Sequence, residues 1–136
     1  MLGSYRVSKP LERILLVEDD LDISMIAQIA LANVGGFKVH SCDNGMQALE
    51  DAPGFAPDLI LLDVMMPKMD GPTTMMKLKE LPALADVPVI FVTAKAQPHE
   101  QEKYLNMGVK AVIPKPFNPM TLASSIQQIW DQLGEA

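Results

Sequence analysis

Residues 57–67 read PDLILLDVMMP, and this stretch decides the predicted fold. Four aliphatic residues, 59–62, stand between a Pro-Asp pair and a later proline, without the alternation of a half-exposed strand. Such an uninterrupted run is typical of an interior strand of a parallel sheet, buried on both faces. Asp63 therefore ends a buried strand, and we expect it to face the crevice where open α/β sheets place their chemistry.

Similar apolar runs recur along the chain and alternate with amphipathic segments. We predict strands at residues 13–17, 37–41, 58–62, 88–92 and 110–113, with helices in the intervals. This alternation predicts an α/β protein with a parallel sheet that helices cover on both faces. For the five strands we take the flavodoxin-like, doubly wound (βα)5 arrangement, in the order 2-1-3-4-5.

Capping residues, prolines and glycines mark the expected helix ends. The first helix begins near Asp20, which we interpret as its N-terminal cap. We expect the first helix to end at residues 35–36. The second helix is expected to start at 44–45 and end at 53–54, and the fourth to start at 98 and end at 108. The third is expected to start at 71–72 and the fifth at 118–119.

Composition limits the class of protein. A chain of 136 residues, nearly half of them apolar, suits one domain, which we place at residues 11–136 behind a flexible leader at residues 1–10. A formal net charge of −6 predicts no direct nucleic-acid partner, because binding a phosphate backbone needs clustered cations. The single cysteine and the absence of a signal-peptide pattern favour the cytoplasm, and no stretch predicts a membrane span.

Acidic residues also end the first predicted strand, at Glu18 and Asp19. In the predicted strand order the first and third strands are neighbours, so both side chains converge with Asp63. Three carboxylates repel one another unless a cation neutralises them, and Mg²⁺ prefers such oxygen ligands together with a phosphate. Thr93 and Lys115 follow the fourth and fifth strands and offer a hydroxyl and an ammonium to a phosphoryl oxygen.

These residues fall into motifs that resemble the receiver domains of two-component response regulators, the CheY-like family, over residues 13–133. The motifs are LLVEDD at 15–20, PDLILLDVMMP at 57–67, MDG at 69–71, VTA at 92–94 and KPF at 115–117. Each motif is weak by itself, but their joint order and spacing are specific. The resemblance implies a phosphoaccepting signalling domain of a phosphorelay rather than an enzyme.

The resemblance also implies a role for each residue of the site. Asp63 would accept a phosphoryl group from a sensor histidine kinase or a phosphotransfer protein, and the resulting conformational change would alter binding of an unidentified downstream protein. Lys115 and Thr93 would bind the attached phosphoryl group, and the peptide between Lys115 and Pro116 would be cis. The implied Mg²⁺ ligands are Glu18, Asp19, Asp63 and the backbone carbonyl of Met65.

One position departs from the family pattern. Val112 stands three residues before Lys115, where the family commonly carries a Tyr or Phe whose ring reports phosphorylation. Either a smaller repacking replaces that movement or another surface provides the output. A degenerate receiver, acting as a phosphorylation-independent interaction module, is the alternative that Val112 keeps open.

Other classes fit less well. A flavin- or nucleotide-binding domain would show glycines rather than carboxylates after the first strand. A phosphatase resembling the haloacid dehalogenases would carry a second Asp at the position of Met65. We assign no catalytic role to His40 or His99 and interpret Cys42 and Trp130 as structural or surface residues. We expect a monomer or weak dimer, either a stand-alone receiver with no following output domain or a fragment of a longer protein.

Overall fold

Five parallel strands form one sheet in the order β2-β1-β3-β4-β5, which confirms the predicted topology. The strands are β1 (Arg13–Val17), β2 (Lys38–Cys42), β3 (Leu59–Asp63), β4 (Val89–Thr93) and β5 (Ala111–Pro114). The computed structural model describes residues 9–134. Most of the predicted leader, residues 1–8, lies outside the described residues, whereas Lys9 and Pro10 are described.

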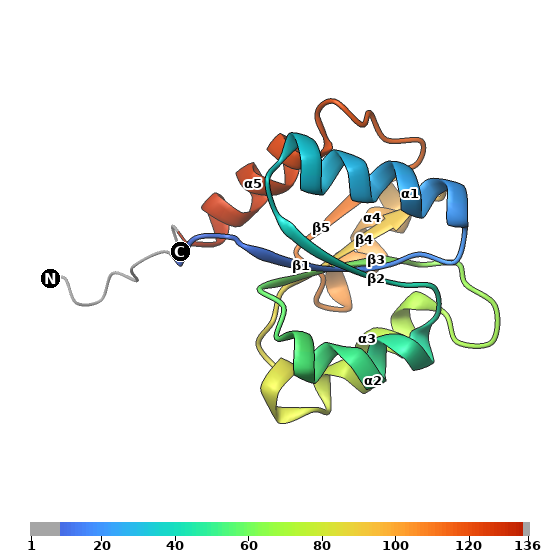
Figure 1. The fold of residues 1–136 in the computed structure, drawn as a ribbon. Helices are drawn as coiled ribbons and strands as arrows, with labels where there is room; N and C mark the ends of the chain where they lie inside the picture. The colour runs from blue at the N-terminus through green and yellow to red at the C-terminus, as the bar shows by residue number, and fades with distance from the viewer. Residues whose placement is uncertain (1–8, 135–136) are drawn as a thin grey trace, which may run out of the picture.

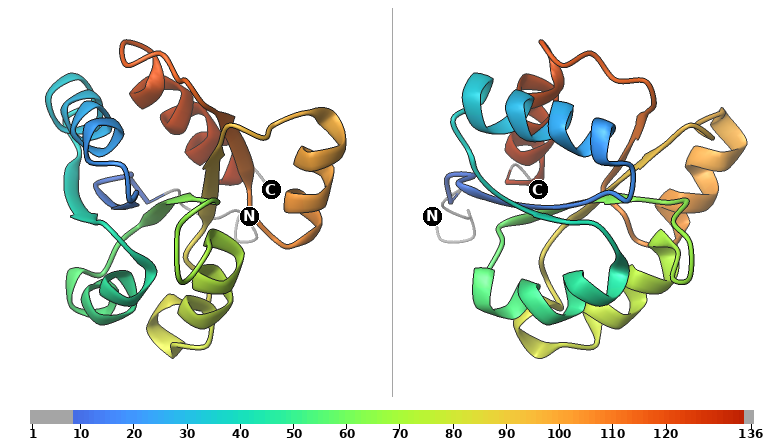
Figure 2. Two further views of the ribbon diagram at one scale, coloured as in Figure 1. Left: turned by 90° about the vertical axis from the view of Figure 1, so that its right-hand side faces the viewer. Right: turned by 45° about the vertical axis from the view of Figure 1, so that its right-hand side comes forward.

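Helices cover both faces of the sheet, as predicted (Figures 1 and 2). The helices are α1 (Leu21–Ile29), α2 (Gly45–Phe55), α3 (Gly71–Lys79), α4 (Pro98–Asn106) and α5 (Leu122–Leu133), with a π-helical segment η1 (Ala30–Val34) and a short 3-10 turn η2 (Pro82–Leu84). Helices α1 and α5 lie on one face, and α2 and α3 lie on the other (Figure 1). The chain is therefore wound in two layers of helix around one central sheet.

Strand β3 is the centre of the core, and all five of its residues are buried. Leu59 and Leu61 pack toward α1 and α5, while Ile60 and Leu62 pack toward α2 and α3. Successive side chains of a strand point to opposite faces, so an interior strand needs apolar residues at every position. The uninterrupted aliphatic run therefore forms an interior strand that is buried on both faces, as the sequence predicted.

The helix starts follow the predicted capping chemistry. The carboxylate of Asp20 accepts the backbone N–H groups of Asp22 and Ile23 at the start of α1, and Asn44 accepts that of Gln47 at the start of α2. Asp70 does the same for α3, accepting the N–H of residue 73 at 2.9 Å. Side-chain oxygens at these positions satisfy backbone donors that the first helical turn leaves unpaired.

Some helix boundaries differ from the prediction. The predicted end of the second helix at residues 53–54 is wrong, because α2 continues through Pro53 to Phe55. Pro53 lies in the last turn, where its missing N–H removes only one hydrogen bond, and the helix ends when Ala56 turns left-handed at φ 55°. The fifth helix begins only at Leu122, after a turn, and η2 had no counterpart in the prediction.

The register of the strands brings the polar residues to one edge. Val17 of β1 pairs with Leu62 of β3, so the residues that follow them, Glu18 and Asp63, lie at the same height. Thr93 pairs with residue 114, which places Lys115 directly beyond the next strand end. The loops that follow β1 and β3 accordingly lie together at the right-hand edge of Figure 1.

Candidate functional site

Three side chains from three strand ends meet at the carboxyl edge of the sheet. The ammonium Nζ of Lys115 lies 2.7 Å from Oε1 of Glu18 and 3.1 Å from Oδ1 of Asp63. All three side chains are withdrawn from solvent, with exposed fractions of 16% for Lys115 and 4% for each carboxylate. The Lys115–Pro116 peptide is cis, as the resemblance implied.

Asp63 is in an unfavourable electrostatic environment. Burial, followed by the neighbouring carboxylates of Asp19 and Glu18, raises the pKa of Asp63 to about 7, although Lys115 opposes the shift. Burial by itself would lower the pKa of Lys115, but its bonds to Glu18 and Asp63 raise it instead. Lys115 therefore stays cationic, while Asp63 carries more repulsion than one ammonium relieves.

The carboxylates of this edge suit a divalent cation. Glu18, Asp19 and Asp63 each offer an oxygen atom, and these oxygens all lie within 4.8 Å of one another. Three ionised carboxylates around one ammonium leave two negative charges uncompensated, which a divalent cation balances. Hard oxygen ligands of this kind are those that Mg²⁺ prefers, so the donor set fits the predicted ion.

The loop after β3 passes close beneath the carboxylate of Asp63. The backbone N–H of Met65 donates to Oδ1 of Asp63 at 3.3 Å, and the side chain of Met65 is exposed. Gly71 closes the loop by donating its N–H to the carbonyl of Val64 at 2.8 Å. A side chain at residue 71 would collide with the backbone carbonyl of Asp63, so this close approach requires glycine. Sequence reasoning assigned Gly71 to the MDG motif and to the start of a helix, and missed this role.

Thr93 lies at the same edge but does not bond the carboxylates. Its side chain is buried, and its hydroxyl oxygen accepts the backbone N–H of Lys95 at 3.0 Å. Its carbonyl accepts the N–H of Lys115 at 2.9 Å, which ties the ends of β4 and β5 together. Val112, at the position where the family carries an aromatic ring, is partly buried against the core on the α2 and α3 side.

Comparison with known proteins identifies the family of this chain. The family model described as response regulator receiver domain matches residues 14–127, which covers most of the chain. This chain belongs to the response regulator receiver domain family. It is therefore a signalling domain of two-component systems, as the resemblance implied.

Individual relatives extend this finding. A response regulator from Desulfuromonas acetoxidans superposes with a TM-score of 0.81 at 32% identity, over 90% of this chain and 98% of that chain. The probable transcriptional regulator ycf29 of Pyropia yezoensis is 38% identical over 117 residues, 86% of this chain and 52% of that protein. The DNA-binding dual master transcriptional regulator RpaA of Synechocystis sp. is 32% identical over 117 residues, 86% of this chain and 48% of that protein. The chain thus spans about half the length of these two curated relatives.

The prediction of no direct nucleic-acid partner is wrong in view of these relatives. RpaA is named as DNA-binding, and ycf29 is named as a probable transcriptional regulator. The prediction rested on the net charge of −6, but that charge is counted only over these 136 residues. The relatives are about twice as long, so the charge of the matched half does not decide whether a whole protein such as RpaA binds DNA.

No helix within residues 9–134 is both long enough and apolar enough to cross a membrane.

Proposed function

We propose that Asp63 is the phosphoacceptor of this receiver and that its phosphorylation changes the contacts of the domain with protein partners. One observation carries the proposal. The carboxylate of Asp63 is buried at the end of β3 beside two other carboxylates, with the ammonium of Lys115 at 3.1 Å. A structural aspartate would be surrounded by donors, whereas this one faces mainly negative charge and keeps acceptor capacity for a positively charged or phosphoryl-bearing ligand.

The proposed reaction is a phosphoryl transfer to a carboxylate. An oxygen of Asp63 forms a bond to the phosphorus of a phosphohistidine on a sensor kinase or phosphotransfer protein, while the P–N bond breaks and its electron pair returns to the imidazole, which takes up a proton. Lys115 lies where negative charge develops on the phosphoryl oxygens, so its ammonium stabilises the transition state. The product is an acyl phosphate on Asp63.

Glu18, Asp19 and Asp63 would hold Mg²⁺ in this site, together with the backbone carbonyl of Met65 as the expected further ligand. Such an ion supplies charge neutralisation for the approaching phosphoryl group and relieves the repulsion among the carboxylates. Lys115 would add its positive charge to that of the ion, because it already bridges Glu18 and Asp63.

Phosphorylation would act on the loop after β4. The new group adds roughly −1.5 to −2 charges, which attract hydroxyl and ammonium donors. Thr93 would exchange its contact with the N–H of Lys95 for a bond to the phosphoryl group, and the loop after β4 would move with it. Reversing a two-state equilibrium from 1:99 to 99:1 takes about 5.5 kcal/mol, which several charge-assisted bonds of roughly 1.5–3 kcal/mol each supply.

The names of the relatives suggest where the signal goes. ycf29 and RpaA are transcriptional regulators by name. We infer that this receiver controls a transcriptional output. Because residue 112 is a valine, the change in contacts that carries the signal does not depend on an aromatic ring at that position.

The decisive experiment measures covalent modification. Wild-type protein, Asp63→Asn and Asp70→Asn are incubated with Mg²⁺ and acetyl phosphate and then weighed intact. Asp70→Asn is the matched control, because Asn caps a helix as well as Asp does. We expect one phosphoryl group on the wild type and on Asp70→Asn and none on Asp63→Asn. Absence of modification from the wild type would favour the phosphorylation-independent interaction module instead.

A second variant separates acceptance of the phosphoryl group from its consequence. In Thr93→Ala the carboxylate and Lys115 are unchanged, so we expect Asp63 to be modified as in the wild type. Phosphorylation of the wild type is expected to change hydrogen exchange in residues 94–106. In Thr93→Ala this change should be at least about fivefold smaller, because the hydroxyl that would bond the phosphoryl group is absent. An exchange response equal to that of the wild type would refute the role of Thr93.

A further inference from the structure

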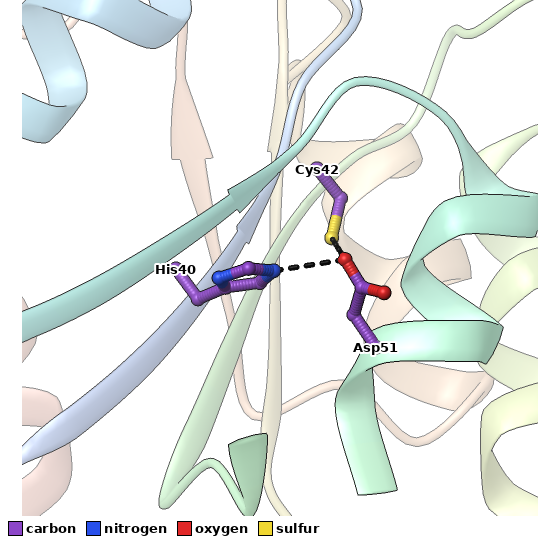
Figure 3. Close-up of side chains that lie close together, drawn as sticks. All are labelled: His40, Cys42 and Asp51. Carbon is purple, nitrogen blue, oxygen red and sulfur yellow. Dashed lines mark hydrogen bonds and ion pairs between the residues drawn. The ribbon is translucent and has the colours of Figure 1, made fainter. Parts of the chain in front are cut away.

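A second group of metal-binding side chain types lies outside the acidic site, between β2 and α2. The group, named here the β2–α2 cluster, consists of His40, Cys42 and Asp51 (Figure 3). Nε2 of His40 lies 2.9 Å from Oδ2 of Asp51, and Sγ of Cys42 lies 3.8 Å from the same oxygen. All three donor atoms lie within 4.8 Å of one another.

Local structure explains why these residues meet. His40 and Cys42 are two positions apart on β2, so both side chains point to the face of the sheet that α2 covers. Asp51 lies on α2 beside Ala52, which is buried against that face. The ring of Phe55, with its centroid 5.3 Å from that of His40, packs beside the imidazole. The elements therefore hold an imidazole, a thiol and a carboxylate together with their polar atoms converging (Figure 3).

An ordinary explanation is a surface His–Asp pair above an inert core cysteine. That explanation accounts for the bond between His40 and Asp51, but it does not account for the direction of Cys42. The thiol is fully buried in the core beneath α2 and α3, yet its sulfur also contacts a carboxylate oxygen at 3.8 Å. Burial, followed by Asp51, raises the pKa of Cys42 to about 12, so without a metal ion the sulfur remains a protonated, weak donor.

We propose that the β2–α2 cluster binds a divalent transition-metal ion of the Zn²⁺ type through Nε2 of His40, Sγ of Cys42 and an Oδ atom of Asp51. Imidazole, thiolate and carboxylate are the protein ligands that Zn²⁺ takes. One thiolate and one carboxylate balance the two charges of the ion, so the occupied site is neutral. On binding, the thiol proton leaves for solvent and the sulfur–metal bond replaces the S–H bond.

The separations suit this coordination. Metal–ligand distances of about 2.0–2.3 Å in a tetrahedron place the ligand atoms about 3.3–3.6 Å apart. The observed 2.9 Å and 3.8 Å lie within a few tenths of an ångström of that range. The third pair, Nε2 of His40 and Sγ of Cys42, lies within 4.8 Å and would close further on binding. His40 and Asp51 have exposed side-chain fractions of 40% and 32%, so the fourth position opens to solvent and takes a water molecule. The ion would fasten the edge strand β2 to α2.

The acidic site requires a precaution in the test, because it also offers carboxylates to a metal ion. The two sites are adjacent, since the carbonyl of Cys42 accepts the N–H of Glu18 at 3.0 Å. Excess Mg²⁺ is therefore kept in all solutions to occupy the acidic site. Co²⁺ is then titrated into reduced, tag-free protein, because a thiolate ligand gives Co²⁺ an intense near-ultraviolet charge-transfer band that oxygen ligands do not give. Zn²⁺ affinity is measured by calorimetry and by competition with bound Co²⁺.

The variants are His40→Gln, Cys42→Ser and Asp51→Asn, and the controls are His99→Gln and Asp131→Asn. His99 and Asp131 are exposed and lie outside the cluster, so these controls remove an imidazole and a carboxylate without touching it. We expect one Co²⁺ and one Zn²⁺ per wild-type chain with the charge-transfer band present. Each cluster variant is expected to weaken Zn²⁺ binding at least tenfold, by analogy with the roughly 10–100-fold loss for ligand-supporting residues. The controls are expected to leave binding unchanged.

Three results would overturn the proposal: wild-type protein without the charge-transfer band, a band that persists in Cys42→Ser, or equal Zn²⁺ affinity in wild type and His40→Gln. His40→Gln also covers the case in which Cys42→Ser does not fold, because His40 is partly exposed and its replacement leaves the core intact. In addition, Zn²⁺ is expected to raise the Tm of the wild type by several degrees and that of His40→Gln by much less. Equal Tm shifts in the two proteins would count against the site.

Discussion

Asp58 immediately precedes β3 and Asp63 is its last residue, and the two differ in chemistry although they are almost equally buried. Their exposed fractions are 6% and 3%. Burial by itself would raise the pKa of Asp58, but hydrogen bonds from Lys9 and from the backbone of Arg13 and Glu12 lower it below the usual value. The pKa of Asp63 is raised to about 7 by burial and by the carboxylates of Asp19 and Glu18.

The difference lies in the donors around each carboxylate. Oδ2 of Asp58 accepts the N–H of Glu12 at 3.0 Å and that of Arg13 at 2.8 Å, and Oδ1 pairs with Lys9 at 2.7 Å. Asp63 has Lys115 at 3.1 Å and a weaker contact from the N–H of residue 65 at 3.3 Å. A buried carboxylate with enough donors holds the fold together, whereas one with too few donors has capacity left for a ligand.

The largest expected effect on stability is at the amino end of β3. Asp58→Ala leaves the N–H groups of Glu12 and Arg13 without their acceptor, so we expect the free energy of unfolding to fall by about 2–4 kcal/mol. Asp63→Asn removes repulsion instead, and in metal-free protein near pH 8 we expect a gain of about 1–2 kcal/mol. Urea denaturation of both variants measures the two changes.

Asp58→Asn is the graded control for this experiment, because its side-chain carbonyl still accepts backbone N–H groups. Its loss should be clearly smaller than that of Asp58→Ala. If Asp58→Ala and Asp63→Asn changed the free energy of unfolding in the same direction, the comparison would fail. That result would mean that burial, rather than the set of donors, decides the role of each carboxylate.

The pH dependence of stability should separate the two carboxylates, with a smaller effect than removal of Asp58. Folded Asp63 binds its proton more tightly than unfolded Asp63, so its contribution to the free energy of unfolding falls as pH rises from about 4 to about 7. The total fall should be about 1–2 kcal/mol, the amount that Asp63→Asn is expected to recover. Asp58 has the opposite sign, because its lowered pKa gives stability that is present above pH 4 and lost only in more acidic solution.

Urea titrations from pH 3 to pH 8 without Mg²⁺ test both statements. The difference between wild type and Asp63→Asn should grow between pH 4 and pH 7, and added Mg²⁺ should remove it. The difference between wild type and Asp58→Ala should shrink below pH 4. A wild type and Asp63→Asn that respond identically to pH would show that Asp63 ionises freely in the folded protein.

The sequence predicted those features that depend on neighbouring residues or on the repeated alternation of strands and helices. The aliphatic run of β3 predicted a buried strand, and Asp20 was predicted as a helix cap from its own position. Asp58 was interpreted only as part of the boundary before the aliphatic run, because its donors lie about 45 residues earlier in the chain. His40 and Cys42 were set aside for the same reason, since the carboxylate that joins them to a cluster comes from the next helix. Side chains that meet through tertiary packing leave no periodic signal in the sequence.

The smallest expected effect is at Lys9, and it sharpens the comparison of the two ion pairs. Lys9 pairs with Asp58 at 2.7 Å but is 68% exposed, whereas Lys115 is 16% exposed. Lys9→Ala is expected to lower the free energy of unfolding by at most about 0.5–1 kcal/mol, because solvent and salt screen an exposed pair and the backbone donors of Asp58 remain. Urea denaturation at low and high salt measures this loss, which should shrink as salt is added. A salt-independent loss as large as that of Asp58→Ala would mean that the ammonium, rather than the two backbone N–H groups, is what satisfies the buried carboxylate.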